Sequence, residues 1–430
     1  MNKFARILQL IVGLGLVGAV LAPGLSPAQA ASPLKIEDLY NPLKIVRSDL
    51  SIPANSIASL RSAPKTYVPA SISMSLDGRV SGSVAILVRL KGSTSLQYDG
   101  GDIDGTPSFK IKFPKATTPY GYLGLRRMTF NAMIQDNSKI HEYGAYALFN
   151  AMGVPASKTG WQRIYMNGKD MGLYINVETP DSVFMQKRFK DITQHIYEGR
   201  ANKDWEIGNS DGTADTGSFL VDYGWKVTPN KDDLSTLFDY MSDFIPADWY
   251  KGMATATNRT LLIRSFAVEN FLSHWDSYSG PLKNNYFLRS NTKGQFTYIP
   301  WGTDQTFGEN RKTDTLGDTF SVPLLATTSA HPYDSRKSYR GKAYVMCIQY
   351  SVCKKAYLLE LKAVSAKATG MKLATQMKAV ANVINPVLAI QFKNNPSKMT
   401  LARNEQTRSI SYIAKRQSEV AALLKSNGIK

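Results

Sequence analysis

The stretch HWDSYSGPLKNNYFLRSNTKGQFTYIPWGTDQTFG, residues 274–308, holds two short strand-like segments with polar residues at both ends. NNYFLRS and GQFTYIPW are rich in aromatic and β-branched residues, and the NTKG sequence between them is typical of a tight turn. Asp276 precedes the first segment and Asp304 follows the second. Because antiparallel strands return the chain to its starting end, we expect both carboxylates and either Asn284 or Asn285 to converge.

Two carboxylates and an amide are hard oxygen ligands, which suit Mg²⁺ or Mn²⁺ and suit zinc poorly. The order of Asp276, an asparagine and then Asp304 after a β-hairpin is also the layout of a protein-kinase catalytic centre. In that layout the first aspartate orients the acceptor hydroxyl, and the other two residues hold metal on the nucleotide phosphates. The alternative is that these are ordinary helix-end and turn residues.

The first 30 of the 430 residues have the features of a secretory signal peptide. Lys3 and Arg6 precede an apolar run that ends near Leu21, and Ala28-Gln29-Ala30 provides an A-x-A cleavage site. We therefore expect a secreted or cell-envelope protein that begins near Ala31, with no further membrane-spanning segment. The alternative is that the apolar run remains as a membrane anchor.

The chain has two cysteines, Cys347 and Cys353, and four histidines. In an exported protein, two cysteines six positions apart predict a small-loop disulfide. A zinc site would need more thiolate or imidazole partners than this region supplies.

The formal net charge of +18 favours anionic partners, such as an acidic cell-envelope surface or a phosphate-bearing ligand. The lysines and arginines form no concentrated arm, and the sequence contains no recognisable nucleic-acid-binding module, so we expect no nucleic-acid partner. A well-solvated basic surface is the alternative explanation of the charge.

Hydrophobic periodicity predicts an α+β protein of two lobes with a cleft between them. We expect an extended, mostly irregular lead-in over 31–83, a β-rich lobe over 84–200 and a mainly helical lobe over 201–430. The predicted elements are strands at 84–92, 108–113 and 128–133, a helix from Asp136–Ser138 to Gly153, a hairpin turning at Asn167-Gly168, a helix over 259–276, and long helices after about 335. These final helices are expected to complete the helical lobe; a separate cap is the alternative.

The β-rich lobe also contains candidate nucleotide-binding residues. RLKGSTS places Lys91, Gly92, Ser93 and Ser95 directly after a buried strand, where backbone N–H groups and hydroxyls could cradle phosphates. With one glycine, this segment could equally be a polar turn.

The alternating segment SFKIKF puts Lys110 and Lys112 on one strand face, from which either could contact the α- and β-phosphates. Glu142, on the following helix, could tether that lysine through an ion pair. A solvated strand face and an exposed helix carboxylate are the alternatives.

Several of these segments together resemble the CotH family, the atypical protein kinases of the spore-coat-protein-H type. The resemblance runs from about residue 86 to 310 and rests on VRLKGSTS, PSFKIKF, NAMIQDNSKIHEYGAYALFNAMGVPAS, RIYMNGKDMGLYINVETPD, FLSHWDSYSG, NNYFLRS and GQFTYIPWGTDQTFG. It implies a diverged protein-kinase-like fold, and secreted or surface-located members that phosphorylate Ser/Thr residues of other proteins. ATP and a divalent cation, Mg²⁺ or Mn²⁺, are the implied cofactors.

The resemblance also assigns roles to individual residues. Asp276 matches the catalytic aspartate of the family's W-D-x-Y motif, and Asn285 matches the asparagine of its N-Y-[YF] motif, with Asn284 as a possible substitute. Asp304 matches the metal-binding aspartate of the D-x-T-[FW]-G motif. Glu178, in NVETPD, matches an acid near the lobe junction that would position the nucleotide site.

Two positions depart from the family pattern. Gly302 stands where many members have an additional acid, and His141 stands where many have arginine before the helix glutamate. A catalytically degenerate member that serves as a surface-binding or structural envelope protein is therefore the main rival to an active kinase. A metal-dependent phosphoesterase fits less well, because such sites need more ligands than this cluster offers.

Overall fold

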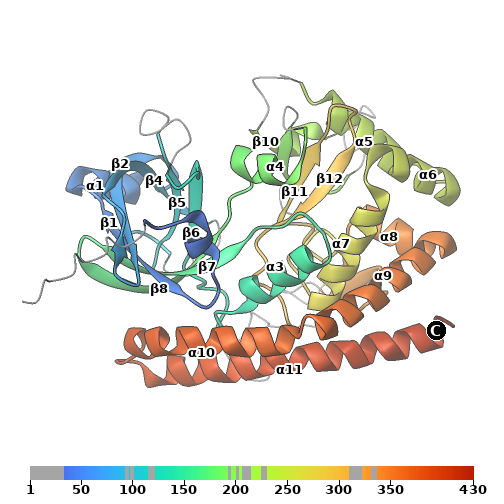
Figure 1. The fold of residues 1–430 in the computed structure, drawn as a ribbon. Coiled ribbons are helices and arrows are strands. Elements are labelled where there is room, and N and C mark those ends of the chain that lie inside the picture. Colours follow the sequence, from blue (N-terminus) through green and yellow to red (C-terminus); the bar gives the residue numbers. More distant parts are fainter. Residues whose placement is uncertain are drawn as a thin grey trace, which may run out of the picture.

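The computed structural model describes residues 33–92, 96, 101–114, 122–191, 195–199, 203–205, 215–223, 230–308, 322–330 and 337–430. The proposed signal peptide and two of the candidate phosphate-binding residues, Ser93 and Ser95, lie outside these ranges. The described chain is α+β, with a sheet-rich N-terminal half and a helical C-terminal half, as expected (Figure 1).

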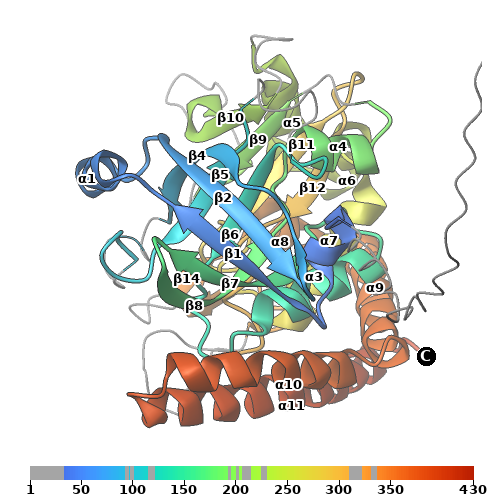
Figure 2. The same cartoon turned by 60° about the vertical axis from the view of Figure 1, so that its left-hand side comes forward.

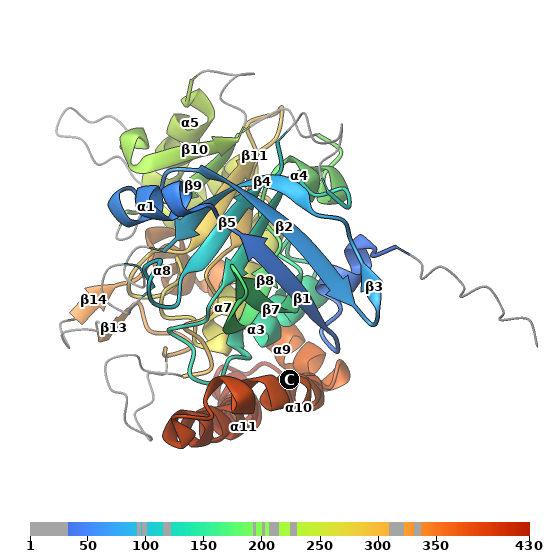
Figure 3. The same ribbon diagram turned by 90° about the vertical axis from the view of Figure 1, so that its left-hand side faces the viewer.

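The N-terminal half is an eight-stranded sheet in the order β1-β7-β8-β6-β5-β4-β2-β3. Because β1 pairs with β7 on one side and with β2 on the other, the sheet closes into a barrel (Figure 3). The strands are β1 (Ile45–Ser51), β2 (Val68–Leu76), β3 (Arg79–Val80), β4 (Val84–Lys91), β5 (Ser108–Lys112), β6 (Arg127–Asn131), β7 (Thr159–Met166) and β8 (Lys169–Val177).

The expectation of an irregular lead-in over 31–83 was wrong. After a short 3₁₀ helix, η1 (Ile36–Tyr40), this segment contributes β1, α1 (Ala54–Ser62), β2 and β3 to the barrel. In β2, Val68, Ile72, Met74 and Leu76 are buried between less buried residues, the alternation of a strand with one face in a core. The many serines between these apolar residues made a strand resemble a loop.

The other strand predictions in this half are confirmed. The β7–β8 hairpin turns at Asn167 and Gly168, whose φ angles of +50° and +81° are those of a two-residue hairpin turn. The helix after β6, α3 (His141–Ala151), begins later than predicted. The carboxylate of Asp136 accepts hydrogen bonds from the backbone N–H groups of Lys139 and His141, which holds the preceding residues in a loop.

The two faces of the barrel wall differ in their surroundings. The inward face of β4, β5 and β6 packs Val88, Ile111 and Phe130 into the barrel core. The outward face of the same strands is polar. By contrast, Leu173 and Ile175 on the outward face of β8 join the core that is shared with α3 and the C-terminal helices.

The helical half surrounds a second sheet in the order β10-β9-β11-β12. The predicted β11–β12 hairpin is confirmed, and the helix before it ends at Leu272, four residues earlier than predicted. The elements of this half are α4 (Ser182–Arg188), β9 (Ile196–Gly199), η2 (Thr216–Ser218), β10 (Phe219–Tyr223), α5 (Asp232–Ser242), α6 (Pro246–Ala256), α7 (Arg259–Leu272), β11 (Tyr286–Ser290), β12 (Phe296–Pro300), β13 (Thr328–Ala330), β14 (Lys337–Tyr339), α8 (Lys342–Gln349) and α9 (Ser351–Gly370). Cys347 in α8 and Cys353 in α9 form the predicted disulfide.

The last two helices, α10 (Leu373–Gln391) and α11 (Pro396–Ser426), lie side by side and run beneath both halves (Figures 1 and 2). The α10 helix packs against β8 and α3, whereas α11 packs against α7 and α9. The side chain of Gln391 accepts a hydrogen bond from the backbone N–H of Leu173. These helices therefore join the barrel to the helical half, a role beyond the expected completion of one lobe.

Among the described helices, α10 alone is long and apolar enough to cross a membrane by length and composition. The expectation had been that no such segment follows the signal peptide. Its buried residues include Met377, Ile384 and Leu388, and they form one stripe against the rest of the protein. This is the packing of an amphipathic helix that buries one face against the protein.

Gly160 allows β7 to approach η1 closely. A Cβ atom at this position would overlap the carbonyl oxygen of Leu39, and the backbone cannot move aside without shifting η1. We expect Gly160→Ala to lower the free energy of unfolding by about 1–3 kcal/mol, the usual cost of overpacking. The measurement is urea denaturation, with Gly82→Ala as the control, because a Cβ at Gly82 has no neighbour within 4 Å. Equal stability of the two variants would contradict this close approach.

Candidate active site

The first cluster of the site forms around Asp276, in the loop that follows α7. Its carboxylate oxygens accept one hydrogen bond from Asn285 Nδ2 at 2.7 Å and one from Asn284 Nδ2 at 3.1 Å. Asn285 directly precedes β11, in a left-handed backbone conformation with φ +52°. The expected meeting of Asp276 with the asparagine pair is therefore present, and both asparagines take part.

The opposite end of the hairpin returns to the same place. The backbone N–H of Trp301 donates to the carbonyl of Asn285 at 3.0 Å, and Asn285 Nδ2 also reaches the carbonyl of Gly302 at 3.4 Å. Asp304 lies two residues farther along this loop. The residues before β11 and after β12 therefore lie close together, as expected for an antiparallel pair of strands.

Gly302 is needed at its position for two reasons. Its φ angle of +54° disfavours other residues, and a Cβ atom there would lie 2.7 Å from the amide of Asn285. The additional acid seen at this position in many similar sequences would therefore displace Asn285 in this chain.

His274 is a site residue that the sequence reasoning missed. It is buried, and its Nε2 donates to the carbonyl of Gly302 at 3.1 Å. Burial lowers the pKa of His274 to about 4, against the opposing effect of this hydrogen bond, so the ring is neutral near pH 7. Its place two residues before Asp276, in the HWD sequence, was the available signal.

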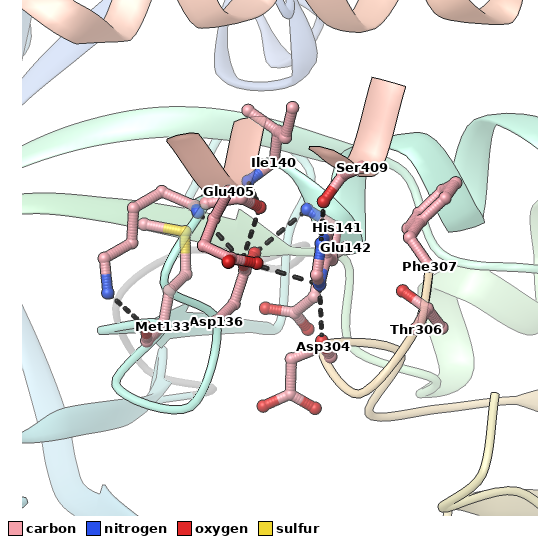
Figure 4. A network of polar contacts seen from close by, with 12 residues as sticks. Met133, Asp136, Ile140, His141, Glu142, Asp304, Thr306, Phe307, Glu405 and Ser409 are labelled. Atoms are coloured by element: carbon pink, nitrogen blue, oxygen red, sulfur yellow. Dashed lines mark hydrogen bonds and ion pairs between the residues drawn. The ribbon is translucent and has the colours of Figure 1, made fainter. Parts of the chain in front are cut away.

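His141, the first residue of α3, contacts Asp304. Its Nδ1 lies 2.9 Å from the carbonyl oxygen of Asp304, and Figure 4 shows the Asp304 carboxylate directed away from the ring. Burial lowers the pKa of His141, so this ring is also neutral near pH 7. The residue that departs from the family pattern therefore supports the loop that carries Asp304.

Glu142, the next residue of α3, is buried close to Asp304. Burial, together with the charge of Asp304, raises the pKa of Glu142 to about 8, against the lowering effects of Lys91 and of a hydrogen bond from Asn131. That hydrogen bond, from Asn131 Nδ2, is 2.6 Å long. A buried carboxylate under such influences is typical of a functional site.

A polar row on the outward face of the barrel leads to Glu142. Lys91 on β4 pairs across the strands with Ser108 on β5, and the Ser108 hydroxyl lies 3.2 Å from Asn131 Oδ1. The structure thus differs from the expectation that Glu142 tethers Lys110 or Lys112. Lys91 is the lysine whose charge acts on Glu142.

Lys110 and Lys112 lie farther along the same face of β5. Lys110 pairs with Arg89 on one side and Thr129 on the other, and it lines a small cavity of about 120 Å³ together with Tyr67 and Arg127. Lys112 is exposed, and its Nζ lies 5.9 Å from the centre of the Tyr67 ring. Lys110 therefore lines this cavity, and Lys112 does not.

Glu178 lies at the junction between β8 and α4. Its two carboxylate oxygens accept bonds of 2.6 and 3.2 Å from the guanidinium of Arg188, and one also accepts from the backbone N–H of Lys158. This buried pair joins the end of the barrel to the first helix of the other half. Both oxygens are thus occupied by protein groups rather than directed to a ligand.

The oxygen atoms of Asp304 and Asn285 are of the kind that bind a hard divalent cation together with a phosphate-bearing ligand. Within the described part of the chain, His, Cys, Asp and Glu side chains form no group of three or more that could hold a metal. Magnesium commonly binds through one or two protein carboxylates and completes its shell with water and substrate phosphates. Asp304 and the amide oxygen of Asn285 match that pattern.

Fold and site together define an α+β protein with a carboxylate–amide centre at the end of a β-hairpin, and with a buried glutamate, Glu142, that is influenced by the charges of Asp304 and Lys91. The family model described as CotH kinase protein matches residues 88–420. This chain belongs to that family, which confirms the resemblance drawn from the sequence.

One curated relative is the inner spore coat protein H of Bacillus subtilis (strain 168). It is 25% identical to this chain over 245 residues, which cover 54% of this chain and 64% of the relative. The chain therefore spans less than two thirds of that relative's length.

The raised pKa of Glu142 predicts a pH-dependent cost to folding. Between about pH 4.5 and pH 8 the folded protein keeps a proton on Glu142 that the unfolded chain releases, so this residue lowers stability as pH rises through that window. Glu142→Gln removes the effect. In the absence of metal and nucleotide, the melting temperature of Glu142→Gln minus that of wild type should increase by a few degrees as the pH is raised from 4.5 to 8.

The control is Glu37→Gln, which changes an exposed glutamate, and its difference from wild type should not vary with pH. A pH-independent difference for Glu142→Gln would contradict the raised pKa.

Gly302 supplies a second prediction. The variant Gly302→Asp introduces the acid that many similar sequences have at this position. It should lower the free energy of unfolding by about 1–3 kcal/mol, because aspartate is strained in a left-handed backbone conformation. The contact with Asn285 should add to this cost. Gly78→Asp is the matched control, because Gly78 has φ +76° and open space around its Cβ position. Thermal or urea unfolding of both variants measures the difference. Equal losses would show that Asn285 does not restrict this position.

Proposed function

We propose that this protein is a kinase of the extracellular space or cell envelope that transfers the γ-phosphate of ATP to Ser/Thr hydroxyls of other proteins. The observation that carries the proposal is the arrangement of Asp276, Asn285 and the Asp304 loop at the two ends of one hairpin. This is the placement of catalytic and metal-binding groups in protein kinases. Membership of the CotH kinase family supports ATP as the phosphate donor.

In this proposal the nucleotide occupies the space between the polar face of β4–β6 and the helical half, in a diverged kinase-like arrangement. Lys91 supplies a positive charge beside the phosphates, and Glu142 and Asn131 set its position. Lys110 extends the positive charge along β5. Asp304 and the amide oxygen of Asn285 hold Mg²⁺ or Mn²⁺, which neutralises charge on the phosphates when bound.

Asp276 orients the acceptor hydroxyl and takes its proton. The acceptor oxygen forms a bond to the γ-phosphorus, the bond from that phosphorus to the β–γ bridging oxygen breaks, and Asp276 takes the hydroxyl proton. Hydrogen bonds from Asn284 and Asn285 fix the direction of this carboxylate. Catalysis then comes mainly from positioning and charge stabilisation, with no covalent enzyme intermediate.

The location and partners belong to the same proposal. The relative's printed name places it in the inner spore coat, which supports a coat or extracellular location for this chain, in line with the proposed signal peptide. The charge of +18 favours an anionic envelope surface as the place where it works. The protein substrate would present a serine or threonine hydroxyl.

The test is transfer of label from γ-labelled ATP by the purified protein with Mn²⁺ or Mg²⁺, using one basic and one acidic protein substrate. We expect Asp276→Asn to reduce transfer about 10²–10⁴-fold, the usual contribution of a positioned general base. Asp304→Ala should abolish metal-dependent transfer. Asp239→Asn, an exposed change on α5, is the control and should retain wild-type transfer.

Wild-type rates in Asp276→Asn and Asp304→Ala would refute the site. A metal-dependent thermal shift with ATP but no transfer would indicate a catalytically degenerate, nucleotide-binding protein. If the wild type shows neither transfer nor shift, the surface-binding or structural function replaces the kinase.

A further inference from the structure

We propose that Ser409 of the C-terminal helix α11 and His141 form a positioning pair that sets the direction of the Asp304 carboxylate. This inference rests on the proposed function, because it concerns the same metal-binding loop. It adds a role for α11, a helix that begins almost 90 residues after the end of that loop. Neither residue would touch the nucleotide, so both act through Asp304.

A continuous set of hydrogen bonds connects the three residues (Figure 4). His141 Nε2 lies 2.6 Å from the hydroxyl of Ser409, and His141 Nδ1 lies 2.9 Å from the carbonyl oxygen of Asp304. His141 and Ser409 are both fully buried. Both bonds are therefore shielded from solvent.

The chemistry of the partners defines the position of each proton. A carbonyl oxygen can only accept, so His141 Nδ1 carries the ring proton. The other nitrogen of a neutral imidazole is an acceptor, so the Ser409 hydroxyl donates to Nε2. Ser409 thereby selects the tautomer that can donate to Asp304.

The His141 ring is held in this orientation from several sides. Its backbone N–H donates to Asp136 Oδ2 at 2.9 Å, and the other Asp136 oxygen lies 3.5 Å from His141 Nδ1. The ring also packs against Phe307, with centroids 5.2 Å apart. Asp136 itself is fixed by a 2.6 Å bond from the Ser138 hydroxyl.

Other residues of α11 contact the same two segments. Arg408 Nη1 donates to the carbonyl of Phe307 at 3.0 Å, and Gln406 Nε2 donates to the carbonyl of Ser138 at 3.1 Å. One stretch of α11 thus holds both the loop after Asp304 and the loop before His141. The Ser409 hydroxyl bonds to His141, which in turn bonds to the carbonyl of Asp304, so Ser409 is linked to both segments.

Groups that orient a metal ligand through hydrogen bonds commonly change metal affinity or activity about 10–100-fold when they are removed, and Ser409 acts on Asp304 through His141. We expect Ser409→Ala to raise the Mn²⁺ concentration required for half-maximal phosphoryl transfer about tenfold. The maximal rate at saturating Mn²⁺ should change less. Ser411→Ala, an exposed serine on the same helix, is the matched control and should behave as wild type.

A second readout does not depend on activity. The chain has four histidines, so ¹⁵N-labelling of histidine gives a small set of signals, and His141→Gln assigns the one from His141. In the wild type we expect this ring to be protonated on Nδ1. Ser409→Ala should shift the His141 signal or mix its two tautomers, and Ser411→Ala should leave it unchanged.

The outcomes separate the two proposals. Absence of transfer by the wild type overturns the proposed function, and the positioning role with it. Transfer by the wild type with the same Mn²⁺ requirement in Ser409→Ala and Ser411→Ala overturns the positioning role alone. A wild-type His141 protonated on Nε2 also overturns it.

Discussion

The loop of residues 301–308 is held by buried hydrogen bonds to its carbonyl groups, and the rest of the site depends on this constraint. His274 and Asn285 donate to the carbonyl of Gly302, and His141 donates to the carbonyl of Asp304. Two carbonyls separated by one residue are therefore fixed by side chains from three different segments. Buried backbone groups need such partners, and here the partners fix the backbone on both sides of Thr303.

The partners of this loop come from distant parts of the chain. His274 and Asn285 belong to the helical half, His141 begins the helix that packs beside the barrel, and Ser409 lies on α11. Because α10 contacts the barrel and α11 contacts the helical half, the C-terminal pair joins the elements that carry the site. The two halves are thus held together in part by the same helices that support the loop of Asp304.

The site retains groups that are costly to bury. Glu142 lies in a fully buried position near another carboxylate, and desolvation raises its pKa. Asn131 and Lys91 offset part of this cost, and both lie on the polar outward face of the barrel. The barrel therefore has two tasks: its inward face forms a core, and its outward face on β4–β6 presents polar groups to the site.

The sequence alone determined the α+β class, the β11–β12 hairpin and the convergence at its ends, because each follows from local periodicity and the return of an antiparallel pair. It did not place 45–51 and 68–76 in the barrel, since serines between the apolar residues masked the alternation. Only the tertiary structure decided that the charge of Lys91 acts on Glu142, because strand register places Lys91 opposite Ser108 on this face of the barrel. It also decided the pairing of His141 with Ser409, which lie 268 positions apart and carry no local signal.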